Sequence, residues 1–343
     1  MPWTKVFIEK DETNILQSEG LRVLSFRNAL KEAQAQILTK YPEAFLMGEG
    51  VDDVGGIFGT TLGLVDQFGK ERVMDIPLAE NGMTGIAIGA AAAGMKPIFI
   101  HQRSDFLPMC FDQIVNHAAK LHYMTGGQVH VPLVIRNIIG RGFGSAAQHS
   151  QGLHGIFLHI PGIKIIMPST PYDVKGLLIA AIEDENPILF VEHRWIYDYM
   201  GFVPEEMYSI PIGQGIIRRN GKDITIVALS HMVYESMKAA ILLEKEGIDV
   251  EVIDPRTVKP MDEELIFQSV SKTGRLIVAD VACKTGGIGA EVICKMIERN
   301  INLFKVPPVR INFPDTPTPS SPVLEDAYYP TVSHLVRAVK SMV

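Results

Sequence analysis

The sequence is poor in cysteine and has no block of positive charge. Its three cysteines, Cys110, Cys283 and Cys294, lack the spacing of metal-binding motifs. Because their number is odd, we interpret them as free thiols in a reducing compartment and expect a cytoplasmic protein. The net charge is −7, and without a basic block we expect no nucleic acid partner.

Long hydrophobic runs are also missing. The longest apolar stretch, residues 85–95, is shorter than the roughly 20 residues that cross a bilayer, and it is rich in glycine and alanine. Residues 1–14 lack the continuous apolar core of a signal peptide. We therefore expect no membrane partner. With 47% hydrophobic and 21% charged residues, the composition is that of a globular protein long enough for two domains.

Helical and extended patterns alternate along the chain. Residues 25–41 carry apolar side chains at helical spacing and stop before Pro42. Short apolar runs bounded by Gly, Pro or Asn predict buried strands at 44–50, 131–137, 163–169 and 187–193. Helices are expected at 111–123 and 171–184. This alternation predicts an α/β fold with mostly parallel sheets.

An irregular segment, residues 192–215, interrupts the alternation with aromatic, Gly and Pro residues. The pattern then restarts, with strands expected at 223–229, 249–255 and 275–280 and helices at 233–247, 262–274 and 330–343. We place a domain boundary near Met207. This gives an N-terminal arm (1–20), a first domain (21–206) and a second domain (207–343), within the usual size range of domains.

A single carboxylate, Glu80, stands within "DIPLAENGMTG" (75–85), between an expected strand at 72–79 and a run of small residues. Parallel sheets bind ligands beyond the carboxyl ends of their strands, and Gly82, Gly85 and Gly89 would let a flat ligand approach closely. The alternative is a tight strand-to-helix turn in which Glu80 is a first-turn acid favoured by the helix dipole.

Two further segments carry candidate site residues. Phe106 is expected in a loop after a strand at 97–101, and His149 ends the glycine-broken stretch "GRGFGSAAQHSQG". A glycine-rich loop that carries a histidine is a candidate active-site loop. Core packing for Phe106 and a turn bonded to the backbone for His149 are the alternatives.

Together these segments resemble one family. From about Val23 onward the chain resembles the beta subunits of the thiamine-diphosphate-dependent 2-oxoacid dehydrogenases, the pyruvate, branched-chain and acetoin enzymes of the transketolase superfamily. The resemblance rests on the order and spacing of "GEGVDDVGGIF", "DIPLAENGMTG", "DQIVNHAAK", "QHSQ", "VIDPRTVKPMD" and "TGGIGAEV". It implies a thiamine-diphosphate-binding fold of the pyrimidine type, followed by a domain like the C-terminal domain of transketolase.

The resemblance also implies roles for four residues. Glu80 would hydrogen-bond the aminopyrimidine ring of thiamine diphosphate and help it to generate the carbon nucleophile, and Phe106 would stack on the ring. His149 would face the reaction centre, and Glu49 would lie at the cofactor.

A structural potassium ion is implied near "AAIEDENP", at Leu133, Ala181, Ile182, Asp184 and Asn186. A plain helix C-terminus before Pro187 is the alternative and needs no ion.

One family motif is missing. Relatives hold the cofactor diphosphate, through a divalent metal, with a "GDG" segment and a later asparagine, and "GDG" does not occur in this sequence. The resemblance therefore implies that diphosphate and magnesium lie on a separate alpha subunit, in an assembly of two alpha and two beta chains. The implied reaction is decarboxylation of a 2-oxoacid, with transfer of the acyl group to the lipoyl domain of an acyltransferase.

Other interpretations stay open at this point. One is a split transketolase-like or acyl-transferring enzyme that acts on a sugar and has no lipoyl partner. Another is a noncatalytic assembly subunit. Arg103 and Arg141 are additions to the family pattern that could bind a carboxylate or phosphate, or could lie paired at a subunit contact.

Overall fold

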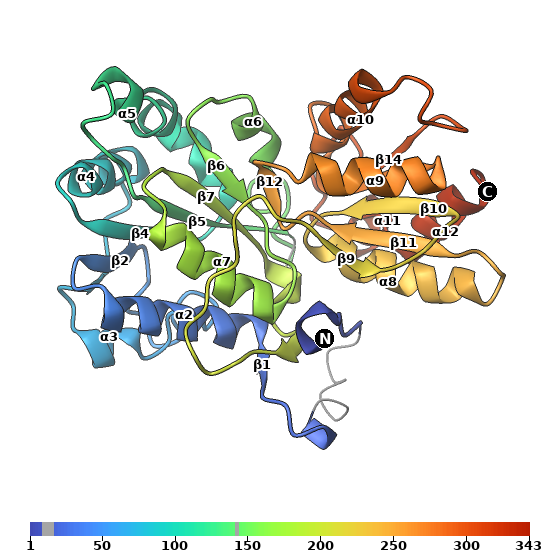
Figure 1. Ribbon diagram of the computed structural model, residues 1–343. Helices are drawn as coiled ribbons and strands as arrows, with labels where there is room; N and C mark the ends of the chain where they lie inside the picture. The colour runs from blue at the N-terminus through green and yellow to red at the C-terminus, as the bar shows by residue number, and fades with distance from the viewer. Residues whose placement is uncertain (9–16, 141–143) are drawn as a thin grey trace.

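Two α/β sheets lie side by side in the computed structural model, which describes residues 1–8, 17–140 and 144–343 (Figure 1). One sheet has seven strands in the order β12-β6-β7-β5-β4-β2-β3, and the other has five in the order β14-β13-β10-β11-β9. A separate antiparallel pair joins β1 (Val23–Ser25) to β8 (Met200–Phe202). Most neighbours within the two large sheets are parallel, so the expected α/β class is confirmed.

The seven-stranded sheet is built almost entirely from the first half of the chain. Its strands are β2 (Ala44–Gly48), β3 (Val73–Met74), β4 (Lys96–His101), β5 (Val134–Ile139), β6 (Lys164–Ile166), β7 (Ile188–His193) and β12 (Thr257–Lys259). Only β12 comes from the second half, and it runs antiparallel to β6. The edge strand β12 of this sheet therefore comes from the part of the chain that builds the five-stranded sheet.

Helices cover both faces of this sheet. They are α2 (Phe26–Lys40), α3 (Leu64–Phe68), α4 (Glu80–Ala92), α5 (Leu121–Met124), α6 (His154–Leu158) and α7 (Pro171–Glu183), with 3-10 turns η2 (Ser104–Cys110) and η4 (Arg194–Ile196) and a π-helical turn η3 (Gln113–Ala118). The hydroxyl of Ser25 accepts the backbone N–H of Asn28 at 3.3 Å and begins α2 as an N-cap.

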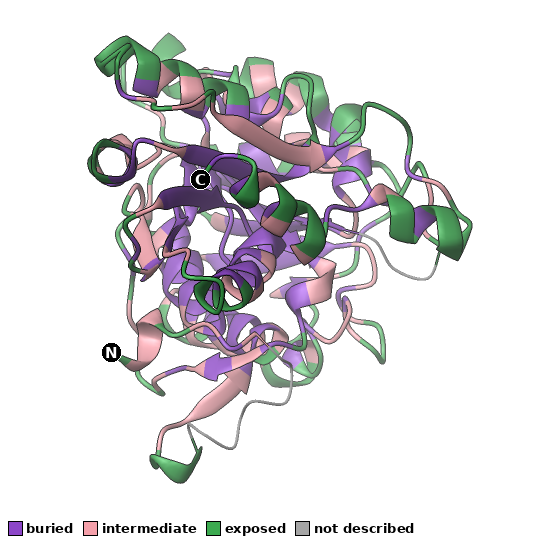
Figure 2. Cartoon of the chain, turned by 90° about the vertical axis from the view of Figure 1, so that its right-hand side faces the viewer, coloured by how far each residue is buried: buried purple, intermediate pink, exposed green. Residues whose placement is uncertain are grey.

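The five-stranded sheet belongs to the second half of the chain. Its strands are β9 (Ile216–Arg219), β10 (Ile224–Ala228), β11 (Val250–Asp254), β13 (Leu276–Cys283) and β14 (Val309–Phe313). Its helices are α8 (His231–Glu244), α9 (Glu263–Thr273), α10 (Ile288–Arg299), α11 (Pro322–Tyr328) and α12 (Val332–Lys340). The central strands β10, β11 and β13 are buried along most of their length, as the purple centre of the molecule in Figure 2 shows, whereas β9 and β14 are mostly half-buried.

Two local predictions were wrong. The strand expected at 72–79 pairs only at Val73–Met74, because Pro77 has no N–H to donate and the Asp75 carboxylate accepts the N–H of Gly50 at 2.7 Å instead. The helix expected at 111–123 is a π-helical turn followed by the short α5. Ile114 and Ala118 are buried, whereas Tyr123 is exposed, so the sequence predicted a helical segment but not the winding of its backbone.

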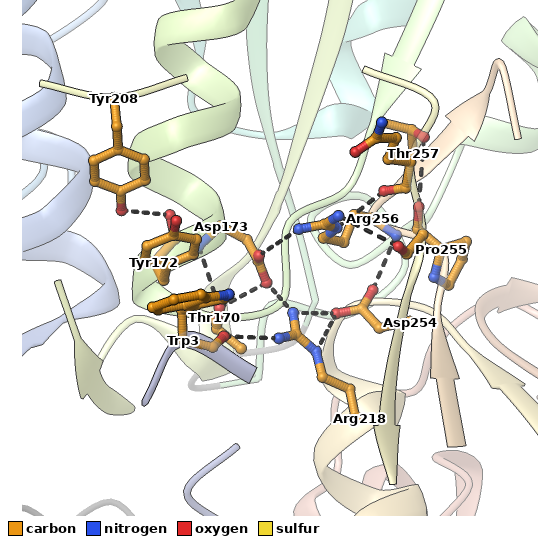
Figure 3. A network of polar contacts seen from close by, with 12 residues as sticks. Trp3, Thr170, Tyr172, Asp173, Tyr208, Arg218, Asp254, Pro255, Arg256 and Thr257 are labelled. Carbon is orange, nitrogen blue, oxygen red and sulfur yellow. Dashed lines mark hydrogen bonds and ion pairs between the residues drawn. The ribbon is translucent and has the colours of Figure 1, made fainter. Parts of the chain in front are cut away.

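A buried network of charges connects the two halves (Figure 3). The guanidinium of Arg218 donates to the carboxylate of Asp254 at 2.8 Å and also bonds Asp173 of α7. Arg256 donates to Asp173 at 3.4 Å, so two arginines meet two aspartates. The backbone carbonyl of Trp3 accepts from Arg218 at 3.2 Å, which ties the start of the chain to the same junction. These contacts hold the two sheets in one orientation.

Within the described ranges, the helices are all too short or too polar to cross a bilayer.

Candidate active site

Glu80 opens helix α4 and lies at the wall of a cavity of about 130 Å³. Glu80 is only 7% exposed. Among the described residues, no group donates a hydrogen bond to its carboxylate. Glu49, Phe106, His149 and Arg103 line the same cavity. The structure thus brings together all four residues that the sequence analysis assigned to the cofactor and the reaction centre.

Glu49 follows the carboxyl end of β2 and lines the same cavity as Glu80. Burial raises the pKa of the Glu49 carboxyl, and the negative charges of Glu80 and Asp75 raise it further. The backbone carbonyl of Glu49 accepts the side-chain N–H of Gln102 at 2.6 Å, which fixes this turn to the end of β4. Two carboxyl groups in one small cavity favour a ligand that donates hydrogen bonds.

Phe106 and His149 line the same cavity and contact each other. Their ring centroids are 5.4 Å apart and the planes meet at 81°, an edge-to-face contact. Phe106 lies in the 3-10 turn η2, whereas the sequence analysis predicted a loop. His149 is exposed, and its loop is anchored by Gln151, whose backbone and side-chain N–H groups donate to Asp105 Oδ1 at 3.2 and 2.9 Å.

A buried pair of side chains holds the far end of the His149 loop. His154 Nε2 lies 2.9 Å from Asp280 Oδ1, and both side chains are fully buried. His154 begins α6 and Asp280 lies in β13, so this contact ties the loop to the five-stranded sheet. The position of His149 therefore depends on both halves of the chain.

Comparison with known proteins identifies the family. Residues 22–198 match the family "Transketolase, pyrimidine binding domain", and residues 213–335 match "Transketolase, C-terminal domain". The chain is 43% identical to the acetoin:2,6-dichlorophenolindophenol oxidoreductase subunit beta of Bacillus subtilis, over 92% of this chain and 96% of that protein. It belongs to the family of beta subunits of the thiamine-diphosphate-dependent 2-oxoacid dehydrogenases.

Other members of the beta-subunit family are nearly as similar. The 2-oxoisovalerate dehydrogenase subunit beta of Bacillus subtilis is 41% identical over 89% of this chain and 94% of its own length. The pyruvate dehydrogenase E1 component subunit beta of Rickettsia felis is 39% identical over 93% and 98%. A solved structure described as "Split gene transketolase, inactive beta4 tetramer" has a TM-score of 0.75, with 22% identity over 93% of this chain and 98% of that one. At that identity the last match shows a shared fold alone.

The cavity fits the pyrimidine half of thiamine diphosphate, the cofactor that the family implies. An aminopyrimidine ring donates and accepts hydrogen bonds at its edge and presents flat apolar faces. Glu80 offers a buried carboxylate to the edge, and Phe106 offers an aromatic ring to a face. These two side chains therefore suit the edge and the face of such a ring.

At three of the five residues of the expected potassium site, an oxygen already accepts a hydrogen bond. The carbonyl of Ile182 accepts Lys96 Nζ at 2.9 Å, and the carbonyl of Leu133 accepts the N–H of Ile188 at 2.8 Å. Asp184 pairs with Lys164 through one carboxylate oxygen. Its other oxygen accepts hydrogen bonds from the backbone N–H and the side-chain amide of Asn186, at 2.9 and 2.8 Å. Ala181 is buried in α7. Two ammonium groups therefore stand where a cation was expected.

Sequence reasoning missed His101. His101 ends β4, lines the cavity and is fully buried, and this burial lowers its pKa to about 4. Its place at the carboxyl end of a parallel strand was the signal that could have found it. Arg103 lines the cavity as well, whereas Arg141 lies outside the described residues.

Proposed function

We propose that this chain is the beta subunit of a thiamine-diphosphate-dependent 2-oxoacid dehydrogenase, and that its cavity binds the aminopyrimidine ring of the cofactor. The observation that carries the proposal is the buried carboxylate of Glu80, which receives no hydrogen bond from the described residues. A buried carboxylate without a donor costs free energy, so a sequence that keeps one needs a ligand to complete it. Membership of the beta-subunit family supports the identity of that ligand.

The residues of this chain then have distinct tasks. Thiamine diphosphate, when bound, supplies the carbon nucleophile and takes up the electrons of the broken bond. Glu80 shares a proton with the ring nitrogen, and the burial of its carboxyl group strengthens that hydrogen bond. Phe106 supports the face of the ring. His149, exposed at the mouth, orients the substrate carbonyl and exchanges protons with water.

The remaining part of the site belongs to a partner in this proposal. The sequence has no "GDG" segment, and the relatives named as beta subunits imply an alpha chain. We assign the diphosphate and magnesium to that alpha subunit, in an assembly of two alpha and two beta chains that passes the acyl group to a lipoyl acyltransferase. Potassium at the turn after α7 would have to compete with Lys96 and Lys164.

The substrate class is a 2-oxoacid in this proposal, and two of the relatives are named for acetoin instead. The alternative of a split transketolase-like enzyme is not favoured, because the split-gene transketolase is only 22% identical and shows the fold alone. The domain boundary near Met207 is part of the proposal, supported by the gap between the matched ranges 22–198 and 213–335. The cytoplasmic location stays a prediction.

Co-purification with an alpha subunit tests this function. The chain alone and the complex would each be titrated calorimetrically with thiamine diphosphate and magnesium. Turnover of pyruvate, 2-oxoisovalerate and acetoin would be followed by reduction of 2,6-dichlorophenolindophenol. We expect tight binding and turnover in the complex alone, because the chain offers no site for the diphosphate. Tight magnesium-dependent binding by the single chain would overturn the shared site.

A further inference from the structure

Two arginines lie over one phenylalanine ring, and one of the two also lines the cavity that contains Glu80. The guanidinium carbons of Arg103 and Arg194 are 5.4 and 4.3 Å from the ring centroid of Phe58. Arg103 lines the cavity that contains Glu80 and His149. Two positive groups over one ring repel each other. Their shared position therefore requires either nearby negative side chains or a bound anion to compensate the positive charge.

Neither arginine forms an ion pair with a carboxylate among the described residues. Arg103 donates to the carbonyl of Gly140 at 3.1 Å and to the hydroxyl of Ser145 at 3.5 Å, and both acceptors are neutral. Arg194 contacts the rings of Phe58 and Tyr197, the latter at 5.5 Å from the centroid. Burial lowers the pKa of both guanidinium groups, which shows how incompletely their charge is solvated.

Two of the neighbouring acids, Asp198 and Glu192, already pair with other arginines. Asp198 pairs with Arg27, whose guanidinium also donates to the carbonyl of Phe58 at 3.3 Å. Deeper in the domain, Glu192 accepts from Arg136 at 2.5 Å, and both side chains are fully buried. Asp105 Oδ1 accepts two hydrogen bonds from Gln151, and Asp105 Oδ2 is buried without a hydrogen-bond partner in the described ranges, so the negative charge of this carboxylate acts to raise the pKa of Arg103. Arg103 therefore has a nearby charge but no ion-paired carboxylate among the described residues, and Arg194 has no carboxylate partner there.

We propose that Arg103 and Arg194 form an anion subsite for a second anionic group of the substrate, a carboxylate or a phosphate, remote from the reacting carbonyl. The inference rests on the proposed function and narrows its substrate class to 2-oxoacids with a charged tail. A guanidinium binds carboxylate and phosphate oxygens with charge-assisted hydrogen bonds, and the ring of Phe58 holds Arg194 close to Arg103, which lines the cavity. Acetoin has no group for this subsite.

The first test compares matched substrates on the complex with the alpha subunit. The pair 2-oxopentanoate and 2-oxoglutarate has equal chain length and differs in the terminal carboxylate, and 2-oxo-4-phosphonobutanoate replaces that carboxylate by a phosphonate. The better of the two charged tails identifies the anion. We expect Arg194→Met to raise KM for the preferred charged substrate about 10- to 100-fold, while KM for 2-oxopentanoate changes less than about twofold.

Two further variants separate the subsite from a structural role. Arg194→Lys keeps the charge and should recover part of the loss in KM. Arg299→Met is the matched control, because Arg299 also lies over a phenylalanine ring, Phe267, at 3.9 Å, but pairs with Glu264 and belongs to α10 of the second half. It should leave the KM of both substrates unchanged. Equal losses for charged and uncharged tails, or a wild-type preference for 2-oxopentanoate, would overturn the subsite.

A second measurement is independent of turnover. Glutarate and inorganic phosphate would be titrated calorimetrically into the complex and its variants. We expect one of these anions to bind, at least tenfold more weakly to Arg194→Met and with unchanged affinity to Arg299→Met. A wild-type complex that binds neither anion contradicts the subsite. A complex that binds the anion but turns over no 2-oxoacid contradicts the proposed function and leaves the subsite in place.

Discussion

The charges at the junction of the two halves differ from the charges at the cavity. At the junction, two arginines and two aspartates are buried together, and their paired atoms lie within 3.4 Å (Figure 3). At the cavity, Glu80 is buried without a donor from the described residues, and Arg103 and Arg194 have only neutral acceptors or rings. Matched charges fix a conformation, whereas unmatched charges in a cavity indicate a ligand.

The unmatched carboxylate should give the largest effect. We expect Glu80→Gln to lower turnover of the complex by about 10²–10⁴, because an amide cannot share a proton with the ring nitrogen as a carboxyl can. The measurement is hydrogen–deuterium exchange at the thiazolium carbon of the bound cofactor, together with kcat. The unfolding temperature should not fall, since the variant removes a buried charge that has no protein partner. An unchanged exchange rate would remove Glu80 from the reaction.

The matched network should respond in the opposite way. Arg218→Met leaves Asp173 and Asp254 buried with too little positive charge, so we expect it to lower the free energy of unfolding by about 3–5 kcal/mol. Urea unfolding measures this loss. The control is Lys340→Met, which breaks an exposed pair with Glu246 and should change stability by less than about 1 kcal/mol. Equal effects of the two variants would mean that the junction contributes no more than a surface pair.

The buried histidine of the cavity predicts a dependence on pH. The pKa of His101 is lowered by burial to about 4, while an unfolded histidine titrates near 6.5. A depressed folded pKa contributes stability that is complete above pH 6.5 and is lost as the pH falls towards 4. Between pH 7.5 and 5 this group should remove about 2 kcal/mol of the free energy of unfolding.

The matching variant is His101→Leu, which has no proton to bind. Its free energy of unfolding should fall less than that of the wild type over the same pH interval, by about the same 2 kcal/mol. His159→Leu, at an exposed position, is the control and should follow the wild type. A parallel pH dependence of wild type and His101→Leu would show that His101 accepts a proton without unfolding.

The apolar pattern of the sequence predicted helices and strands correctly where the residues of the element itself specify its structure. Helix α2 and strand β5 follow from apolar spacing alone, because burial of one face or one run is enough to specify them. Strand β12 was missed because its three residues pair with β6, about 90 residues earlier, and only tertiary packing makes that contact. Winding of the backbone at η2 and η3 was missed for the same reason.

The site could be predicted only in part. Resemblance to the family singled out Glu49, Glu80, Phe106 and His149, and the structure brings their side chains to one cavity, although their roles stay proposals. That Arg194 has no carboxylate partner among the described residues could not be predicted from sequence. An arginine that has a carboxylate partner and one that lacks it look alike in a sequence, and the distinction depends on which acids other residues have already taken.

The turn after α7 offers the smallest effect and the last test of the comparison, because there a lysine matches a carboxylate that a potassium ion could bind. Burial acts to raise the pKa of Asp184, but hydrogen bonds from Lys164 and Asn186 outweigh it and lower that pKa. Exchanging potassium for sodium at constant ionic strength should therefore change the unfolding free energy of the wild type by less than about 0.5 kcal/mol, since the ammonium group already compensates the charge. Lys164→Met releases the carboxylate. Potassium at ten times its dissociation constant should then add about 1.4 kcal/mol. A large potassium effect in the wild type would show that the ion displaces the lysine, and no effect in Lys164→Met would show that this turn binds no potassium.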